Sequence, residues 1–233
     1  SGSKYPADIH YSDNSVAVFV PKGFVKTDET DFVFYFHGWY SNIDSSLKKF
    51  ELIKQFYESN KNAIFIFPEG PRNSPDSFGG KLEDKNGIQY LLDDIIDYLY
   101  SNNIIKSNKI GKIVLSGHSG AYKVISFILM RGGIPEKIKE VYLFDALYDE
   151  TEKYVYWIDK YNGRFINIYT DDGGTKTESL NLADDFEEWG MAYKHIDEKL
   201  LNDSDLLDNR ILLIHSNDGH NDVIATQNQF LKF

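Results

Sequence analysis

Residues 112–130 read KIVLSGHSGAYKVISFILM, and this stretch decides the fold. The apolar run Ile113–Leu115 predicts a buried strand, and apolar residues at helical spacing follow directly after position 121. Between them the two glycines of Gly-His-Ser-Gly let the chain turn sharply from strand into helix. Ser119 is at the apex of that turn, where the start of the helix presents free backbone N–H groups. A serine in this position can serve as a nucleophile.

The stretch Gly117-His118-Ser119-Gly120-Ala121 resembles the G-x-S-x-G nucleophile elbow of the α/β-hydrolase family. The last glycine of that pattern is Ala121 here, which we interpret as a tolerated small residue. The resemblance implies that Ser119 is the nucleophile and that the backbone N–H of Gly120 helps to hold an oxyanion. The alternative is a loop rich in Gly and Ser that has no catalytic role. The other motifs of the chain are needed to distinguish the two interpretations.

A second loop follows the aromatic and apolar run Phe32–Phe36, which is typical of a strand buried on both faces. The loop begins His37-Gly38-Trp39-Tyr40. In α/β-hydrolases an HG-x sequence in this place builds the other half of the oxyanion hole. The resemblance implies that the Trp39 N–H pairs with that of Gly120, that Gly38 allows close approach to the reacting carbonyl, and that His37 holds the loop by hydrogen bonding.

Apolar runs and helical stripes alternate along the remaining chain. Further strands are expected at 16–20, 63–67, 141–144, 165–169 and 210–214, and helices at 46–59, 87–100, 150–161, 179–201 and 223–231. This alternation predicts an α/β fold of the α/β-hydrolase type, with a mainly parallel sheet covered by helices on both faces. We expect a single domain over 1–233 with a minimal lid or none. Trp189 and Tyr193 are expected in the core, and His195 on a helix surface.

The chain has six histidines, and a serine nucleophile needs one of them as its base. The resemblance favours His220, which lies in the polar loop after the last strand. Two strand ends offer an acid to orient it, and both keep the family order Ser…Asp…His. Asp145 has apolar neighbours, where an acid is costly without a partner, so we prefer it. Asp172 is the alternative, although its string of Asp and Gly is also typical of an ordinary turn.

Composition excludes several other functions. The formal charge is −11, from 36 acidic and 25 basic residues, which disfavours nucleic acid and anionic membranes as partners. There is no cysteine, and no apolar run approaches the roughly 18 residues of a membrane helix. Ser1-Gly2-Ser3 is interpreted as an expression scar. The compartment stays open between the cytoplasm and export with a leader, and the oligomeric state is not predicted.

The sequence therefore predicts a serine hydrolase without a cofactor, most simply an esterase acting on a small-molecule or polymer ester. There are two alternatives. One is a peptidase or amidase that uses the same catalytic residues, and the other is a catalytically inactive binding module on the same scaffold. Tyr40, Phe78 and Tyr148 are expected to contact substrate, with Tyr122 and Trp157 as further candidates for an aromatic cleft suited to sugars or aryl groups. No metal is expected, because the polar residues around His215 and His220 lack a recognised ligand spacing.

Overall fold

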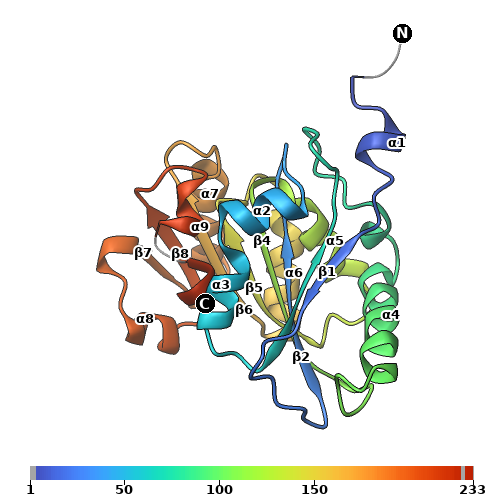
Figure 1. The fold of residues 1–233 in the computed structure, drawn as a ribbon. Helices are drawn as coiled ribbons and strands as arrows, with labels where there is room; N and C mark the ends of the chain where they lie inside the picture. The colour runs from blue at the N-terminus through green and yellow to red at the C-terminus, as the bar shows by residue number, and fades with distance from the viewer. Residues whose placement is uncertain (1–3, 227–228, 233) are drawn as a thin grey trace.

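The computed structural model describes residues 4–226 and 229–232, and in this part of the chain eight strands form one sheet (Figure 1). Their order is β1-β3-β2-β4-β5-β6-β8-β7. The strands are β1 (Val16–Phe19), β2 (Thr30–Phe36), β3 (Ala63–Pro68), β4 (Ile110–His118), β5 (Ile138–Phe144), β6 (Arg164–Thr170), β7 (Lys194–Asp197) and β8 (Ile211–Ser216). All neighbours are parallel except β1, which pairs antiparallel with β3 at the edge. The predicted expression scar lies outside the described residues.

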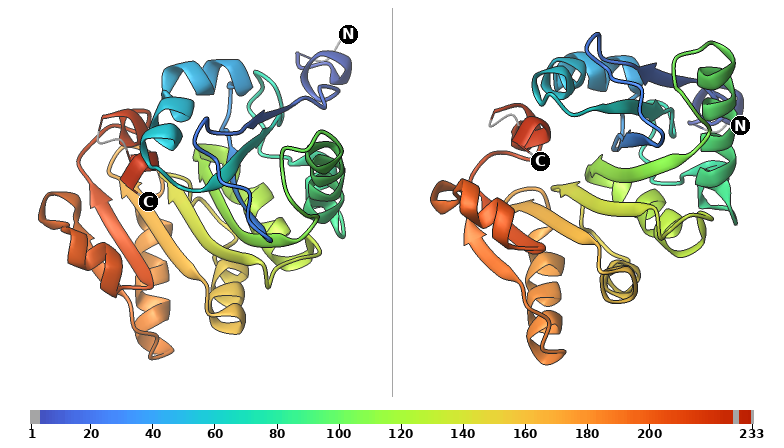
Figure 2. Two further views of the ribbon diagram at one scale, coloured as in Figure 1. Left: turned by 60° about the horizontal axis from the view of Figure 1, so that its bottom comes forward. Right: turned by 90° about the horizontal axis from the view of Figure 1, so that it is seen from below.

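Helices cover both faces of this sheet, as Figures 1 and 2 show. One face carries α4 (Gly87–Ser101), α5 (Tyr122–Arg131), α6 (Thr151–Tyr161) and α7 (Lys176–Glu188). The other carries α2 (Ile43–Lys49), α3 (Leu52–Glu58), α9 (Asp222–Ala225) and α10 (Gln229–Lys232). Smaller elements are α1 (Ala7–His10), α8 (Asp203–Asp208) and the 3-10 turns η1 (Gly80–Glu83), η2 (Ser119–Ala121) and η3 (Glu198–Leu200). The predicted fold class is confirmed.

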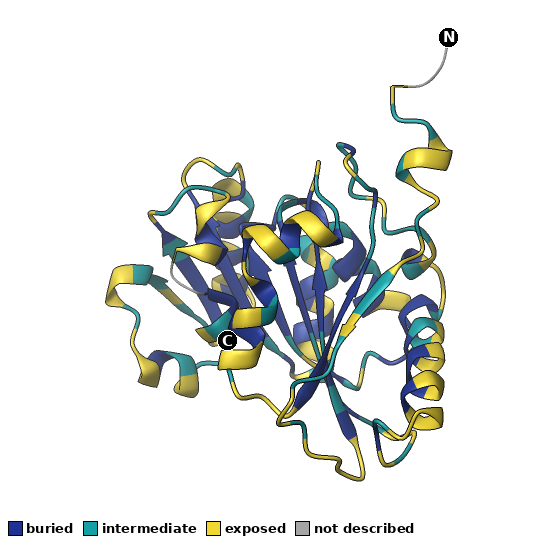
Figure 3. Cartoon of the chain, in the orientation of Figure 1, coloured by how far each residue is buried: buried dark blue, intermediate teal, exposed yellow. Residues whose placement is uncertain are grey.

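The central strands are apolar along their length because both of their faces are covered. Every residue of β3 is buried, and most of β2, β5, β6 and β8 is buried with it. Figure 3 shows the sheet as the buried layer, while the helices expose their outer sides. Parallel strands end at the same edge, so the loops after β2, β4, β5, β6 and β8 lie together there. That edge carries the candidate site.

Two helix predictions were wrong in extent. The predicted helix 46–59 is two helices, α2 and α3, because the backbone at Glu51 takes a left-handed conformation with φ of 48°. The predicted helix 223–231 is represented by α9 and α10, and residues 227–228 between them lie outside the described part of the chain.

The predicted helix 179–201 was wrong in kind as well as extent. Helix α7 ends at Glu188, and Gly190 follows with φ of 64°, which glycine adopts without strain. The chain then forms β7, a short edge strand parallel to β8. Trp189 is 55% exposed and therefore not in the core, whereas the Tyr193 ring packs against Phe186. His195 is exposed as expected, but on a strand.

The connections between strands are compact, and within residues 4–226 and 229–232 none of them forms a separate lid. In the same residues no helix combines the length and the apolar character needed to span a bilayer.

Candidate active site

The turn between β4 and α5 holds Ser119 in a conformation that few residues adopt. Its φ is 56°, in the left-handed region that is costly for a residue with a side chain. The turn is tight because Gly117 has no side chain: a Cβ there would lie 2.6 Å from the Cβ of Ala121. The close approach of the Ala121 methyl group therefore requires glycine at position 117.

The loop after β2 closes against the same turn. A Cβ on Gly38 would lie 2.5 Å from the Cβ of Ser119, so only glycine permits this approach. A Cβ on Gly120 would lie 2.6 Å from the Trp39 ring and 2.7 Å from the Ser77 hydroxyl. The Trp39 indole itself is fixed, because its Nε1–H donates to the Ser77 Oγ at 2.8 Å. Glycines thus let two loops meet directly over the serine.

His220 lies between Ser119 and Asp145. Its Nδ1 is 2.6 Å from Asp145 Oδ2, and its Nε2 is 3.0 Å from Ser119 Oγ. A carboxylate can only accept, so Nδ1 carries the proton that is donated to Asp145. Nε2 is then free to accept from the Ser119 hydroxyl. The chain of hydrogen bonds runs from the serine through the imidazole to the carboxylate.

Asp145 is fully buried and surrounded by donors. Besides His220, the backbone N–H of Thr170 (3.0 Å), the Thr170 hydroxyl (2.7 Å) and the Thr175 hydroxyl donate to it. Burial raises the pKa of Asp145, but the hydrogen bonds from His220, Thr175 and Thr170 outweigh burial and hold that pKa below its usual value. The carboxylate is therefore charged at neutral pH.

The structure separates the two candidate acids clearly. The side chain of Asp172 is exposed, and no hydrogen bond or ion pair joins it to any residue of the described chain. Gly173 follows it and lies against Asp145 instead: a Cβ at Gly173 would be 1.7 Å from Asp145 Oδ2. The β6–α7 loop thus surrounds the Asp145 carboxylate, while Asp172 of the same loop points to solvent.

The backbone N–H groups of Gly120 and Trp39 are the candidates for the oxyanion hole that the resemblance implies. Gly120 belongs to the first turn of η2, where an N–H has no acceptor inside the helix. Among the described residues, none accepts a hydrogen bond from the Trp39 N–H.

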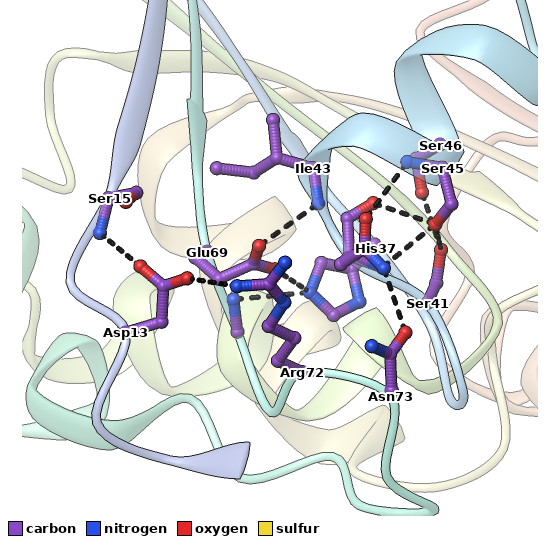
Figure 4. A network of polar contacts seen from close by, with 12 residues as sticks. Asp13, Ser15, His37, Ser41, Ile43, Ser45, Ser46, Glu69, Arg72 and Asn73 are labelled. Carbon is purple, nitrogen blue, oxygen red and sulfur yellow. Dashed lines mark hydrogen bonds and ion pairs between the residues drawn. The ribbon is translucent and has the colours of Figure 1, made fainter. Parts of the chain in front are cut away.

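The loop that carries Trp39 is held in place by buried hydrogen bonds of His37 and Glu69. His37 Nε2 is 2.8 Å from Glu69 Oε1 (Figure 4). His37 Nδ1 donates to the Gly38 carbonyl at 2.7 Å. The second oxygen of Glu69 accepts from the Ile43 N–H at 3.1 Å. Both side chains of the His37–Glu69 pair are almost fully buried. This agrees with the loop-holding role expected of His37, whereas Glu69 was not foreseen.

The residues predicted to contact substrate lie in different settings. The Tyr148 hydroxyl donates to the Gly173 carbonyl at 2.6 Å, contacts Ser119, and burial raises its pKa to about 12. Tyr40 and Phe78 are 62% and 47% exposed. The Tyr122 ring lies 5.7 Å from that of Tyr148, at the same place. Trp157 was wrong as a cleft residue, because it is fully buried in the core under α6.

Sequence reasoning also missed His118, Thr170 and Thr175. His118 is buried beside His220, with ring centroids 4.6 Å apart. Burial, and then the neighbouring His220, lower its pKa to about 4, so it is neutral. The string Asp-Asp-Gly-Gly-Thr at positions 171–175 is typical of a turn, and nothing in it indicated that Thr175 contacts Asp145.

Within the described residues no three His, Asp or Glu side chains are grouped as a metal site.

No protein-family model and no curated protein sequence matches this chain. Solved structures do resemble it. Fluorophosphonate-binding serine hydrolase F of Staphylococcus aureus has a TM-score of 0.57 and 13% identity over 94% of this chain and 89% of its own. S-formylglutathione hydrolase of Staphylococcus aureus has the same TM-score and identity over 94% and 92%. A ferulic acid esterase has a TM-score of 0.56 and 13% identity over 93% and 89%. The chain therefore has the α/β-hydrolase fold.

Proposed function

We propose that this protein is a serine hydrolase that cleaves carboxylic esters through an acyl-enzyme. The observation that carries the proposal is the continuous chain of hydrogen bonds from Ser119 through His220 to the buried Asp145. A serine hydroxyl is a weak nucleophile unless a base lies within hydrogen-bond distance, and the base must itself be oriented. Support of a general kind comes from the fold, which the chain shares with esterases and serine hydrolases.

The first half of the reaction forms the acyl-enzyme. Ser119 Oγ attacks the ester carbonyl while its proton passes to His220 Nε2. The N–H groups of Trp39 and Gly120 hold the developing oxyanion, and the Asp145 carboxylate stabilises the imidazolium. The imidazolium then gives its proton to the leaving alcohol as the carbon–oxygen bond breaks. Ser119 is left carrying the acyl group as an ester.

The second half uses water in the same way. His220 takes a proton from a water molecule, the resulting hydroxide attacks the acyl carbon, and the same two N–H groups hold the second oxyanion. Collapse of this intermediate returns the proton to Ser119 Oγ and releases the carboxylic acid. No step requires a metal or a cofactor.

Hydrolysis of p-nitrophenyl acetate by wild type and by Ser119→Ala tests the proposal. We expect turnover by wild type and a loss on the order of 10⁶-fold in Ser119→Ala, as for other serine triads. The matching anilide, p-nitroacetanilide, distinguishes an amidase, which would cleave it at a comparable rate. A folded wild-type protein that hydrolyses neither compound would point to a binding module on this scaffold.

A further inference from the structure

A hollow with a mixed polar and apolar lining lies to one side of the candidate nucleophile turn. It has a volume of about 420 Å³ and is walled by the N-terminal segment 11–16, by residues 68–71 after β3, and by residues 78–82 with Leu91 of α4. None of these residues belongs to the hydrogen-bonded chain of Ser119. We call this space the side hollow.

A second, smaller space, here called the neck, lies between residues of the side hollow and the nucleophile turn. The neck has a volume of about 20 Å³, room for about one water-sized group, and it reaches Gly120 and Ala121. Residues 68–71, Phe78, Gly79 and Leu82 line both spaces, so the two are neighbours. The side hollow therefore lies near enough to the nucleophile turn for a substrate that reaches past these shared residues to place a larger group in it.

The outer wall of the side hollow carries several polar side chains, although the lining as a whole is more apolar than polar. The segment Tyr11-Ser12-Asp13-Asn14-Ser15 forms this wall, and Lys81 faces it from η1. Across the described residues no hydrogen bond engages the Asn14 amide, the Ser15 hydroxyl or the Lys81 ammonium. These groups offer both donors and acceptors to a ligand. An alkyl chain would have to displace water from them without returning a hydrogen bond, which is unfavourable.

The two carboxylates that line the side hollow, Asp13 and Glu69, have hydrogen-bond partners inside the protein. Asp13 accepts from Arg72 at 2.9 Å and from the Ser15 N–H at 3.0 Å, and Glu69 pairs with His37 (Figure 4). The Tyr11 hydroxyl donates to Asp76 at 2.9 Å, and this holds the N-terminal segment against the loop after β3. What remains for a ligand is a set of uncharged hydrogen-bonding groups beside the ammonium of Lys81, in a chain of formal charge −11.

Aromatic rings flank the same space. Tyr11 is 40% exposed at the outer wall, and Phe78 is 47% exposed where the neck meets the hollow. A sugar ring has an apolar C–H face that packs on aromatic rings and an edge of hydroxyls that needs donors and acceptors. Resting on the proposed esterase function, we propose that the side hollow binds a neutral sugar unit, and that the substrate is a sugar ester cleaved beside this subsite.

Three esters test this inference: cellobiose carrying one acetyl group on a primary hydroxyl, p-nitrophenyl acetate and ethyl octanoate, whose alcohol is as poor a leaving group as that of the sugar. For wild type we expect kcat/KM for the acetylated disaccharide to exceed that for the octanoate. In Asn14→Leu and in Ser15→Val, the ratio of kcat/KM for the disaccharide ester to that for p-nitrophenyl acetate should fall about tenfold, because buried hydroxyls of the sugar lose partners. Asn108→Leu, an exposed Asn in the loop before β4, is the matched control and should keep the wild-type ratio.

The outcomes are separable. Hydrolysis of p-nitrophenyl acetate by wild type together with a preference for the octanoate, or with an unchanged ratio in Asn14→Leu and Ser15→Val, would overturn the sugar subsite and leave the esterase proposal standing. Failure of wild type to hydrolyse any of the three esters would overturn both.

Discussion

The Nε2–H of His118 donates to the backbone carbonyl of His220 at 2.8 Å, and the two imidazole rings lie 4.6 Å apart. His118 also immediately precedes Ser119 in the chain. His118 therefore contacts both parts of the candidate site: its backbone continues into Ser119, the candidate nucleophile, and its side chain holds the loop of the candidate base, His220. Asn221, the next residue of that loop, is held by α2, because Lys49 Nζ donates to Asn221 Oδ1 at 2.8 Å.

Replacement of His118 should affect the chemical step more than substrate binding. His118→Phe keeps a ring but loses the donor, so we expect kcat for p-nitrophenyl acetate to fall at least about tenfold while KM changes little. His118→Gln retains an N–H donor and should recover part of kcat. Thermal unfolding of both variants controls for loss of fold. A wild-type kcat in His118→Phe would contradict this role.

His118 should also make stability depend on pH. Its pKa falls from 6.5 to about 4 on folding, so between these values the unfolded chain binds more protons than the folded one. The free energy of unfolding therefore rises with pH through this window, and roughly 3 kcal/mol is lost as the pH falls from about 7 to about 4. The lowered pKa of Asp145 adds a loss of the same sign at still lower pH.

Urea unfolding at several pH values from 7 down to about 4 measures this dependence. We expect the slope to be smaller in His118→Phe, which has no titrating group at this position. If the free energy of unfolding changed with pH by the same amount in wild type and in His118→Phe, the protonation of His118 would not be linked to unfolding.

The two candidate acids should differ sharply on mutation. Asp145→Asn removes the charge that orients His220, and we expect kcat to fall on the order of 10⁴-fold. Asp172→Asn changes an exposed side chain and should keep kcat within about twofold. Steady-state hydrolysis of p-nitrophenyl acetate by the two variants compares them directly. The reverse ranking would return the role of acid to Asp172.

Gly173 should tolerate no side chain. The Cβ of Gly173→Ala would lie 1.7 Å from Asp145 Oδ2, so the loop or the carboxylate has to move. We expect a destabilisation of about 1–3 kcal/mol and a lower kcat. Gly23→Ala is the matched control, since its Cβ meets nothing within 4 Å. Equal thermal stability and equal kcat in the two variants would contradict the close packing of the β6–α7 loop around Asp145.

The parts of the fold that local sequence determines were predictable. Runs such as Phe32–Phe36 and Ala63–Phe67 are apolar because both sheet faces are covered, and the glycines around Ser119 are needed for a turn this tight. The preference for Asp145 over Asp172 followed from the cost of an acid among apolar neighbours. The donors that offset this cost, Thr170 and Thr175, come from another loop, and they could be identified only from the fold.

The failures have a common physical origin. A helical stripe through Trp189 and Tyr193 suggested one long helix, but a left-handed residue at Gly190 ended it, and β7 is stabilised by its pairing with β8 rather than by its own sequence. Likewise Glu69 and His118 act through partners distant in the chain, His37 and His220. Such pairings depend on tertiary contacts that spacing along the sequence does not encode.

The most direct test of the central claim is labelling with a fluorophosphonate probe, with the modified peptide identified by mass spectrometry. An activated serine is required for this reaction. We predict labelling of wild type at Ser119 alone, no labelling of Ser119→Ala, and labelling of His220→Ala that is slower by orders of magnitude. Absence of labelling in folded wild type, or labelling at Ser119 that is as fast in His220→Ala, would contradict the account of Ser119 as a nucleophile activated by His220.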